Sequence, residues 1–222
     1  MKGKIMSHFG KLFIVLEFIL YAALLAIDIL NLGSSTAVKY TGIILCIFFC
    51  FAAVPDKNDR LTALALLFTG AADLFLLVLN SHYIIGILFF CLVQFLYCLK
   101  LFAVTGKCVP QEIVLRLGLP AAVTLMLGIL GQCNLLNSLA AFYFCNLVIN
   151  GIKSWICTGP GLFTLGLILF ICCDICVGLF NVIPEAGELY RVVSIGMWAF
   201  YLPSQVLIAL TVILKRERRT FL

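Results

Sequence analysis

The stretch "LTALALLFTGAADLFLLVL", residues 61–79, decides how the chain folds, because it is long and apolar enough to cross a lipid bilayer as one helix. Its single charged residue, Asp73, lies near the middle of the run. The whole chain has the same character: 64% of its residues are hydrophobic, 11% are charged, and the mean hydropathy is +1.19. Soluble domains are only about half apolar. The composition therefore predicts an integral membrane protein.

Seven further apolar runs predict an all-α, polytopic membrane bundle of eight transmembrane helices that forms a single domain over residues 1–222. The loops between the runs are too short to hold a soluble domain, so any chemistry is expected inside the bundle or at a membrane face. We expect the spans at about residues 12–32, 37–54, 61–79, 83–104, 113–131, 134–150, 160–183 and 190–214.

The distribution of positive charge agrees with eight spans. All Lys and Arg residues except Lys39 and Arg191 then fall on the side that holds both termini. Loops on the cytoplasmic side of membrane proteins carry the excess of Lys and Arg, so both termini are predicted to be cytoplasmic. The net charge of +5 is accounted for by anionic membrane lipids at that face, and no nucleic-acid partner is expected.

The cysteines and histidines argue against a metal centre or a cofactor. Most of the 11 cysteines lie inside spans without paired CxxC clusters, as small packing residues do. The two histidines, His8 and His82, lie in the N-terminal segment and in a loop. No buried histidine is left to bind zinc or to act as the base of a serine hydrolase. Carboxylate chemistry is what remains.

A second stretch, "LFICCDICVG" at residues 169–178, resembles the first by placing Asp174 inside a long apolar run. The third and seventh spans run in the same direction, so the two aspartates are predicted to lie at similar depth, where they could face each other. The following spans share a pattern around Gln94 and Gln205, in "FCLVQFL" and "YLPSQVL". This hints at two parallel four-helix halves, with chance similarity between apolar sequences as the alternative.

An ionised aspartate inside a spanning helix costs about 2.5–3.5 kcal/mol, so it normally faces a polar interior or stays protonated. Two carboxyl groups that share a buried cavity favour one neutral acid beside one charged partner. Asp73 and Asp174 are therefore predicted to form an acid/base pair. The alternative is that each one only bonds a neighbouring helix and holds the bundle together.

Other polar residues in the spans give weaker signals. Glu17 is expected near the inner face and Asp28 near the outer face, where a carboxylate can reach water. Lys39 could pair with Asp28 or steer an anionic headgroup. Asn146 and Asn150 share one helical face, which indicates hydrogen bonds between helices.

Three motifs resemble those of the YhhN-like family, the lysoplasmalogenases. Residues 68–73, "FTGAAD", resemble its "FSxxGD" motif; residues 170–174, "FICCD", resemble "FxxSD"; and residues 201–208, "YLPSQVLI", are similar to its closing "YxxxQxLI". The chain departs from the family's fourth-span pattern "FxxxHxxY", because Gln94 stands where the histidine is expected between Phe90 and Tyr97. A glutamine can orient a substrate but cannot carry a proton.

The resemblance implies hydrolysis of the vinyl ether bond of a lysoplasmalogen, which releases a fatty aldehyde and glycerophosphoethanolamine or glycerophosphocholine. The lysophospholipid would be the substrate, with Asp73 and Asp174 as the catalytic residues. Residues expected to bind the substrate are Lys39, Gln94, Tyr97, Tyr201 and Gln205.

Two other interpretations stay open. The aspartates could be the proton site of a proton-coupled transporter, since carboxylates inside membranes also mark proton relays. The chain could instead be an inactive lipid-binding membrane protein, which the missing histidine would favour. The sequence leaves the headgroup, the chain preference and the oligomeric state open.

Overall fold

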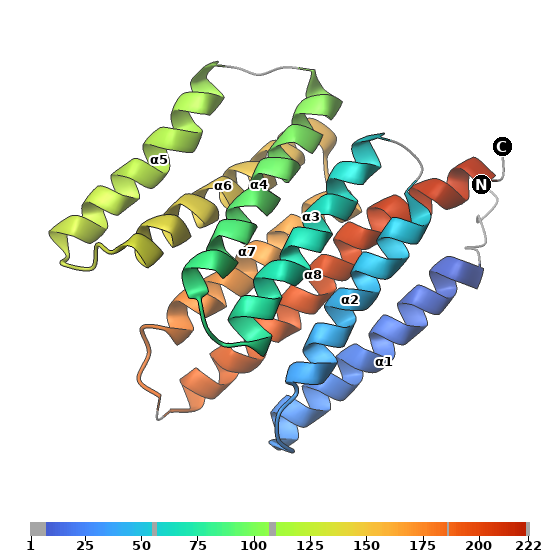
Figure 1. The fold of residues 1–222 in the computed structure, drawn as a ribbon, viewed down its shortest axis with the longest axis horizontal. Helices are drawn as coiled ribbons and strands as arrows, with labels where there is room; N and C mark the ends of the chain where they lie inside the picture. Colours follow the sequence, from blue (N-terminus) through green and yellow to red (C-terminus); the bar gives the residue numbers. More distant parts are fainter. Residues whose placement is uncertain (1–7, 55–56, 107–109, 186, 221–222) are drawn as a thin grey trace.

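A computed structural model describes residues 8–54, 57–106, 110–185 and 187–220. Within these residues the fold is an all-helical bundle of eight long helices, in which the third continues into a short π-helix (Figure 1). The helices are α1 (His8–Leu30), α2 (Thr36–Ala53), α3 (Lys57–Asp73) with η1 (Leu74–Val78), α4 (Tyr83–Thr105), α5 (Pro110–Ile129), α6 (Leu135–Thr158), α7 (Leu162–Phe180) and α8 (Glu188–Thr220).

Local residue chemistry sets several helix ends. Gly106 and Gly159 follow α4 and α6 with φ values of 64° and 72°, which glycine adopts without steric cost. Asn134 caps the start of α6, since its side chain accepts a hydrogen bond from the Asn137 amide at 2.8 Å. The short "GQCN" segment therefore does separate the fifth and sixth spans.

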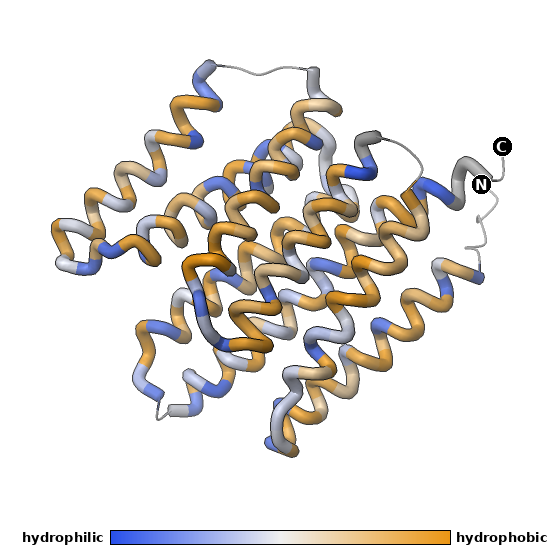
Figure 2. Tube along the Cα trace, in the orientation of Figure 1, coloured by the Kyte–Doolittle hydropathy of each residue, from blue (hydrophilic) through white to orange (hydrophobic). Residues whose placement is uncertain are grey.

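All eight long helices have the length and the apolar composition needed to cross a membrane. Large apolar side chains cover the outside of the bundle; Phe18, Phe48 and Leu125 are 69%, 62% and 71% exposed. Hydrophilic residues gather mainly near the helix ends and in the loops (Figure 2). An apolar exterior of this kind suits lipid rather than water, so the chain is a multi-pass membrane protein.

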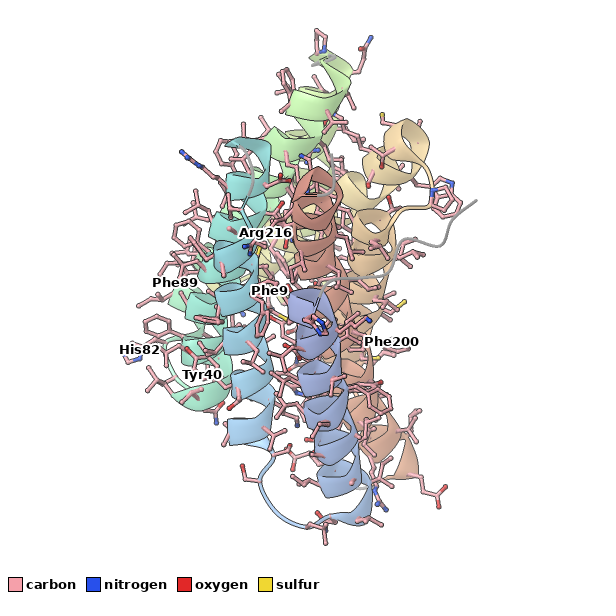
Figure 3. The ribbon with its side chains drawn as sticks, turned by 90° about the vertical axis from the view of Figure 1, so that its right-hand side faces the viewer. Phe9, Tyr40, His82, Phe89, Phe200 and Arg216 are labelled. Carbon is pink, nitrogen blue, oxygen red and sulfur yellow. The ribbon has the colours of Figure 1, made fainter. Side chains whose placement is uncertain are left out.

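The helix α8 lies against α1, α2, α3 and α7 (Figure 1). On the other side of α3, the order of contacts runs through α4 and α6 to α5, which lies at the edge of the bundle. Arg216 near the end of α8 lies 5.1 Å from the ring of Phe9 at the start of α1 (Figure 3). The helix ends on this side are called the termini end below.

The predicted spans agree with the helices except at the sixth. Residues 151–158 were expected to form a loop, but α6 continues through them to Thr158. The polar residues of this segment have partners inside the protein: Lys153 forms an ion pair with Glu112 at 2.6 Å, and Ser154 lies 2.6 Å from the Thr164 hydroxyl. Because these groups are satisfied, the helix does not need to end where the apolar run ends.

Glu17 contradicts its prediction. Its side chain was expected to reach water near the inner face, but it is only 3% exposed and faces the interior. The Cys46 thiol on α2 donates to one carboxyl oxygen at 3.4 Å. Glu17 lies on the buried face of α1, together with Phe13 and Leu24. The face of the helix, rather than the distance to its end, therefore determines whether this carboxylate reaches water.

The structure tests the predicted distribution of Lys and Arg between the two ends of the bundle only for the described residues. The helix bounds place Lys39 and Arg191 near the end opposite the termini end, as expected. The predictions for Lys2, Lys4 and Lys107 fall outside the described residues. Which face is cytoplasmic and whether the chain consists of two parallel halves stay predictions.

Both prolines inside helices are compensated by a neighbouring helix. Proline lacks an N–H, so the carbonyl one turn earlier loses its helical partner. Pro203 in α8 frees the carbonyl of Ala199, which accepts a hydrogen bond from the Tyr21 hydroxyl of α1 at 3.1 Å. In the same way Pro120 in α5 frees the carbonyl of Arg116, and Asn146 of α6 donates to it at 3.4 Å.

We predict that Tyr21→Phe lowers the free energy of unfolding by about 0.5–1.5 kcal/mol, because the freed Ala199 carbonyl loses its donor inside the bundle. Unfolding by SDS in mixed micelles would measure the change. Tyr83→Phe is the control, since the Tyr83 hydroxyl bonds Asn80 at an exposed helix end. An equal loss in both variants would contradict the account of Pro203.

Candidate active site

Asp73 lies where α3 passes into the π-helix η1 and is 5% exposed. The π-helix widens the turn, as the Leu79 amide donates to the Leu74 carbonyl at 2.8 Å, and such turns frequently occur at functional sites. The Tyr201 hydroxyl of α8 lies 2.9 and 2.8 Å from the two oxygens of Asp73. Its single proton is therefore available to either oxygen.

Asp174 on α7 has a tyrosine neighbour of its own. Tyr143 of α6 interacts with the Asp174 carboxyl group electrostatically and as a hydrogen-bonding neighbour. The contact is poorly aligned, because the buried Tyr143 hydroxyl and the buried Oδ2 of Asp174 have no partner of good hydrogen-bond geometry among the described residues. The contact of Tyr143 with Asp174 is therefore weaker than the two close contacts of Tyr201 with Asp73.

Aromatic rings connect the two tyrosines. Phe170, one helical turn before Asp174, lies 5.4 Å from the ring of Tyr201 and 6.2 Å from that of Tyr143. Phe90 of α4 packs against Phe170 at 5.7 Å and against Tyr143 at 5.2 Å. These four residues are buried and form an aromatic wall, the name used below for Phe90, Tyr143, Phe170 and Tyr201.

The two aspartates belong to one cluster. Tyr143 interacts electrostatically with both carboxyl groups, and so does the Cys173 thiol of α7. Both aspartates lie in the half of their helices that is remote from the termini end. The residues therefore come from α3 and from the consecutive helices α6, α7 and α8, which lie far from α3 in the sequence.

Further buried polar atoms lie one turn from these groups. Gln205, one turn after Tyr201 and fully buried, has an Oε1 without a hydrogen-bond partner in the described structure. Thr69, one turn before Asp73, has an Oγ1 in the same situation. Such atoms are rare in folded proteins and indicate a place where water or a ligand bonds.

Gln94 of α4 is 1% exposed, and its amide oxygen accepts a hydrogen bond from Asn150 of α6 at 3.0 Å. The predicted contacts between helices at Asn146 and Asn150 are confirmed, because Arg116 of α5 also donates to both side chains, at 3.1 and 2.8 Å. Gln94 thus belongs to a polar network that extends through Asn150 to α5.

The remaining predicted site residues lie elsewhere. Tyr97 is fully buried against Phe163 at 5.3 Å and interacts electrostatically with Cys46 and Cys50, toward the termini end. Lys39 forms the predicted ion pair with Asp28 at 2.8 Å.

Lys39 is also linked to the site through Trp198. Its ammonium group lies 5.0 Å from the ring of Trp198, which meets Tyr201 edge-on at 5.2 Å. Contact of Lys39 with a headgroup stays a prediction. Both histidines are exposed, His8 at the start of α1 and His82 between η1 and α4.

Sequence reasoning missed Tyr143, Glu112 and the inward direction of Arg116. Tyr143 shares a face of α6 with Asn146 and Asn150, and this spacing was the available signal. Glu112 and Arg116 are one turn apart on α5, a pattern typical of an ion pair, but their spacing alone does not show that the pair faces α6.

Comparison with known proteins gives one match. The sequence model of the YhhN family matches residues 34–212, which include every helix except α1 and the end of α8. No curated protein and no solved structure matches the chain.

We predict that Tyr201→Phe lowers the free energy of unfolding by about 1–3 kcal/mol, because the buried carboxyl group of Asp73 loses its hydrogen bonds. Tyr97→Phe is the matched control, since it removes a fully buried hydroxyl that has no hydrogen-bond partner among the described residues, and it should cost less than about 1 kcal/mol. Denaturant titration of both variants in the same micelles measures the difference. Equal costs would show that the bond to Asp73 contributes nothing.

Proposed function

The chain belongs to the YhhN family, and from this premise we propose that it hydrolyses the vinyl ether bond of a lysoplasmalogen. The products are a fatty aldehyde and glycerophosphoethanolamine or glycerophosphocholine. The observation that carries the proposal is the cluster of Asp73 and Asp174 with Tyr201 and Tyr143 beside them. Family membership supports a membrane hydrolase, and the choice of bond rests on the chemistry of this cluster.

A vinyl ether is cleaved by acid at carbon rather than at oxygen. A general acid protonates the second alkenyl carbon, and the electrons of the double bond leave a cation shared by the first carbon and the ether oxygen. Water then adds to the first carbon and gives up a proton, forming a hemiacetal that splits into the aldehyde and the glycerol hydroxyl. The site must supply one acid, one nearby anion and a group that accepts the proton released by water.

The two carboxyl groups suit different parts of this task. Asp73, with the Tyr201 hydroxyl at 2.8–2.9 Å from both oxygens, suits the carboxylate that stabilises the cation and accepts the proton from water. Asp174, whose Oδ2 has no hydrogen-bond partner among the described residues, suits the neutral acid that donates to carbon. Paired carboxyl groups divide the work in this way in glycosidases.

The aromatic wall supports the same chemistry. Ring faces attract cations, and Phe170 and Phe90 lie between the two tyrosines. The rings also keep bulk water away, which strengthens the attraction between the cation and a carboxylate. The hydrocarbon chain of the substrate would contact these rings.

We predict that Asp73→Asn and Asp174→Asn each reduce aldehyde release from a lysoplasmalogen by about 10²–10⁴-fold, because each removes one of the two required groups. Aldehyde formed by the purified protein in micelles is the measurement. A lysolipid with a saturated ether is the control substrate and should yield no aldehyde. Full activity in both variants would refute the proposal.

A solvent test follows from protonation at carbon. In D₂O the aldehyde should carry one deuterium at the carbon next to the carbonyl, because the acid delivers a solvent-derived proton there. Mass spectrometry of the trapped aldehyde measures this label. An aldehyde without deuterium would exclude carbon protonation as the step that the aspartates catalyse.

One observation favours a second candidate, a proton-coupled transporter. Glu17 is a third buried carboxyl group, on α1, with an Oε2 that has no hydrogen-bond partner in the described structure. Several buried carboxyl groups in one bundle suit proton relays as well as hydrolysis. Flux into proteoliposomes driven by a pH gradient, without aldehyde formation, would support the transporter.

A further inference from the structure

A chain of hydrogen bonds runs from α5 through α6 to α4 and determines how the amide of Gln94 is oriented. Arg116 has only donors, and its guanidinium group donates to Oδ1 of Asn150 at 2.8 Å. The amide nitrogen of Asn150 therefore points the other way. It donates to Oε1 of Gln94 at 3.0 Å and to the backbone carbonyl of Gln94 at 2.9 Å.

The orientation of Gln94 follows from this order. With Oε1 used as acceptor, Nε2 is the atom that Gln94 presents on its other side. Nε2 is buried and has no hydrogen-bond partner among the described residues. Gln94 therefore offers N–H donors, and no acceptor, from this side of its amide.

The part of this hydrogen-bond network that lies on α5 and near the end of α6 holds Arg116 in place. Glu112 accepts from Arg116 at 2.8 Å and from Lys153 at 2.6 Å, and the three side chains are only 11–16% exposed. The carbonyl of Arg116, freed by Pro120, accepts from Asn146. Two cations face one anion here, so the group carries a net positive charge at the termini end of α5 and α6.

Gln94 lies next to the aromatic wall. It is one turn from Phe90 on α4, and Phe90 contacts both Tyr143 and Phe170. Asn150 lies two turns after Tyr143 on α6. The donor amide is thus in the layer of the bundle directly on the termini side of the carboxyl cluster.

We propose that the Nε2 group of Gln94 binds an acceptor oxygen of the glycerophosphate part of a lysolipid, and that Arg116 and Asn150 are positioning residues for this contact. The proposal rests on the proposed function for the choice of a lysolipid. A donor suits a phosphate or glycerol oxygen, whose charge does not become positive during the reaction. The vinyl ether oxygen is a poor partner, because a donor there would oppose the cation. The net positive charge behind Asn150 favours the anionic phosphate.

Asn150→Asp tests the orientation directly. The new carboxylate keeps the contact with Arg116 but cannot donate to Gln94, so the amide of Gln94 should rotate and present Oε1 in place of Nε2. We expect the dissociation constant of a saturated-ether lysophosphatidylethanolamine to rise about tenfold or more. Binding to the purified chain in micelles, measured by calorimetry, does not depend on turnover.

Asn137→Asp is the matched control. It introduces the same charge on α6, but the Asn137 side chain donates to the Gln132 carbonyl at the exposed start of the helix and makes no hydrogen bond to Arg116 or Gln94 in the described structure. We expect its lysolipid affinity to stay within about twofold of the parent chain. Gln94→Glu is the second test variant, because it keeps an acceptor for Asn150 and removes the donor; it should reproduce the loss.

The pattern of binding across the variants decides the proposal. Weaker binding in Asn150→Asp and Gln94→Glu, but not in Asn137→Asp, supports the proposal. If a 1-O-alkylglycerol without phosphate shows no such loss, the acceptor is the phosphate; if it shows the same loss, the acceptor is a glycerol hydroxyl. Unchanged binding in Gln94→Glu, or an equal loss in Asn137→Asp, overturns the proposal. Failure of aldehyde release with this binding pattern intact would refute the hydrolase alone.

Discussion

In the hydrocarbon core of a membrane, each polar group must find its partner inside the protein, and the architecture of this bundle follows from that requirement. The two prolines inside α5 and α8 free carbonyls, and Asn146 and Tyr21 of neighbouring helices supply the missing donors. The same rule governs the carboxyl groups. Asp73 is tied to α8 through Tyr201, so the hydrogen bond that makes the aspartate tolerable also fixes the site between helices distant in sequence.

The candidate functional groups lie where this requirement for an internal hydrogen-bond partner is only partly met. Oδ2 of Asp174, the Tyr143 hydroxyl, Nε2 of Gln94 and Oε1 of Gln205 are buried atoms that have no hydrogen-bond partner among the described residues. They gather on α4, α6, α7 and α8 around the aromatic wall. Unpartnered buried atoms of the described residues also lie farther away, such as Oε2 of Glu17 on α1 and the Tyr97 hydroxyl on α4. Ion pairs such as Asp28 with Lys39 instead hold neighbouring helices together.

The sequence predicted the fold well, because apolar runs of bilayer length and polar loops report directly on spanning helices. It also found Asp73 and Asp174, since a carboxylate within such a run is conspicuous. It failed at the end of α6 and at Glu17, because the cost of a polar residue depends on partners from other helices. The packing of Tyr97 against Phe163 likewise depends on another helix, and the binding of substrate by Tyr97 stays a prediction. The orientation of Arg116 toward Asn146 and Asn150 depends on the packing of α5 on α6, which no local pattern specifies.

The proposed hydrolysis requires that Asp73 and Asp174 act on the two adjacent alkenyl carbons of one substrate beside the aromatic wall, with Asp174 as the acid at the second carbon and Asp73 as the carboxylate beside the first. The most direct test is an experimental structure of the chain with a bound saturated-ether lysophosphatidylethanolamine. We expect the ether-linked chain to pass along Phe170 and its second carbon to lie within about 3–3.5 Å of a carboxyl oxygen of Asp174, with Asp73 on the other side. A lysolipid bound at a different place, with both carboxyl groups remote from the ether, would exclude this arrangement.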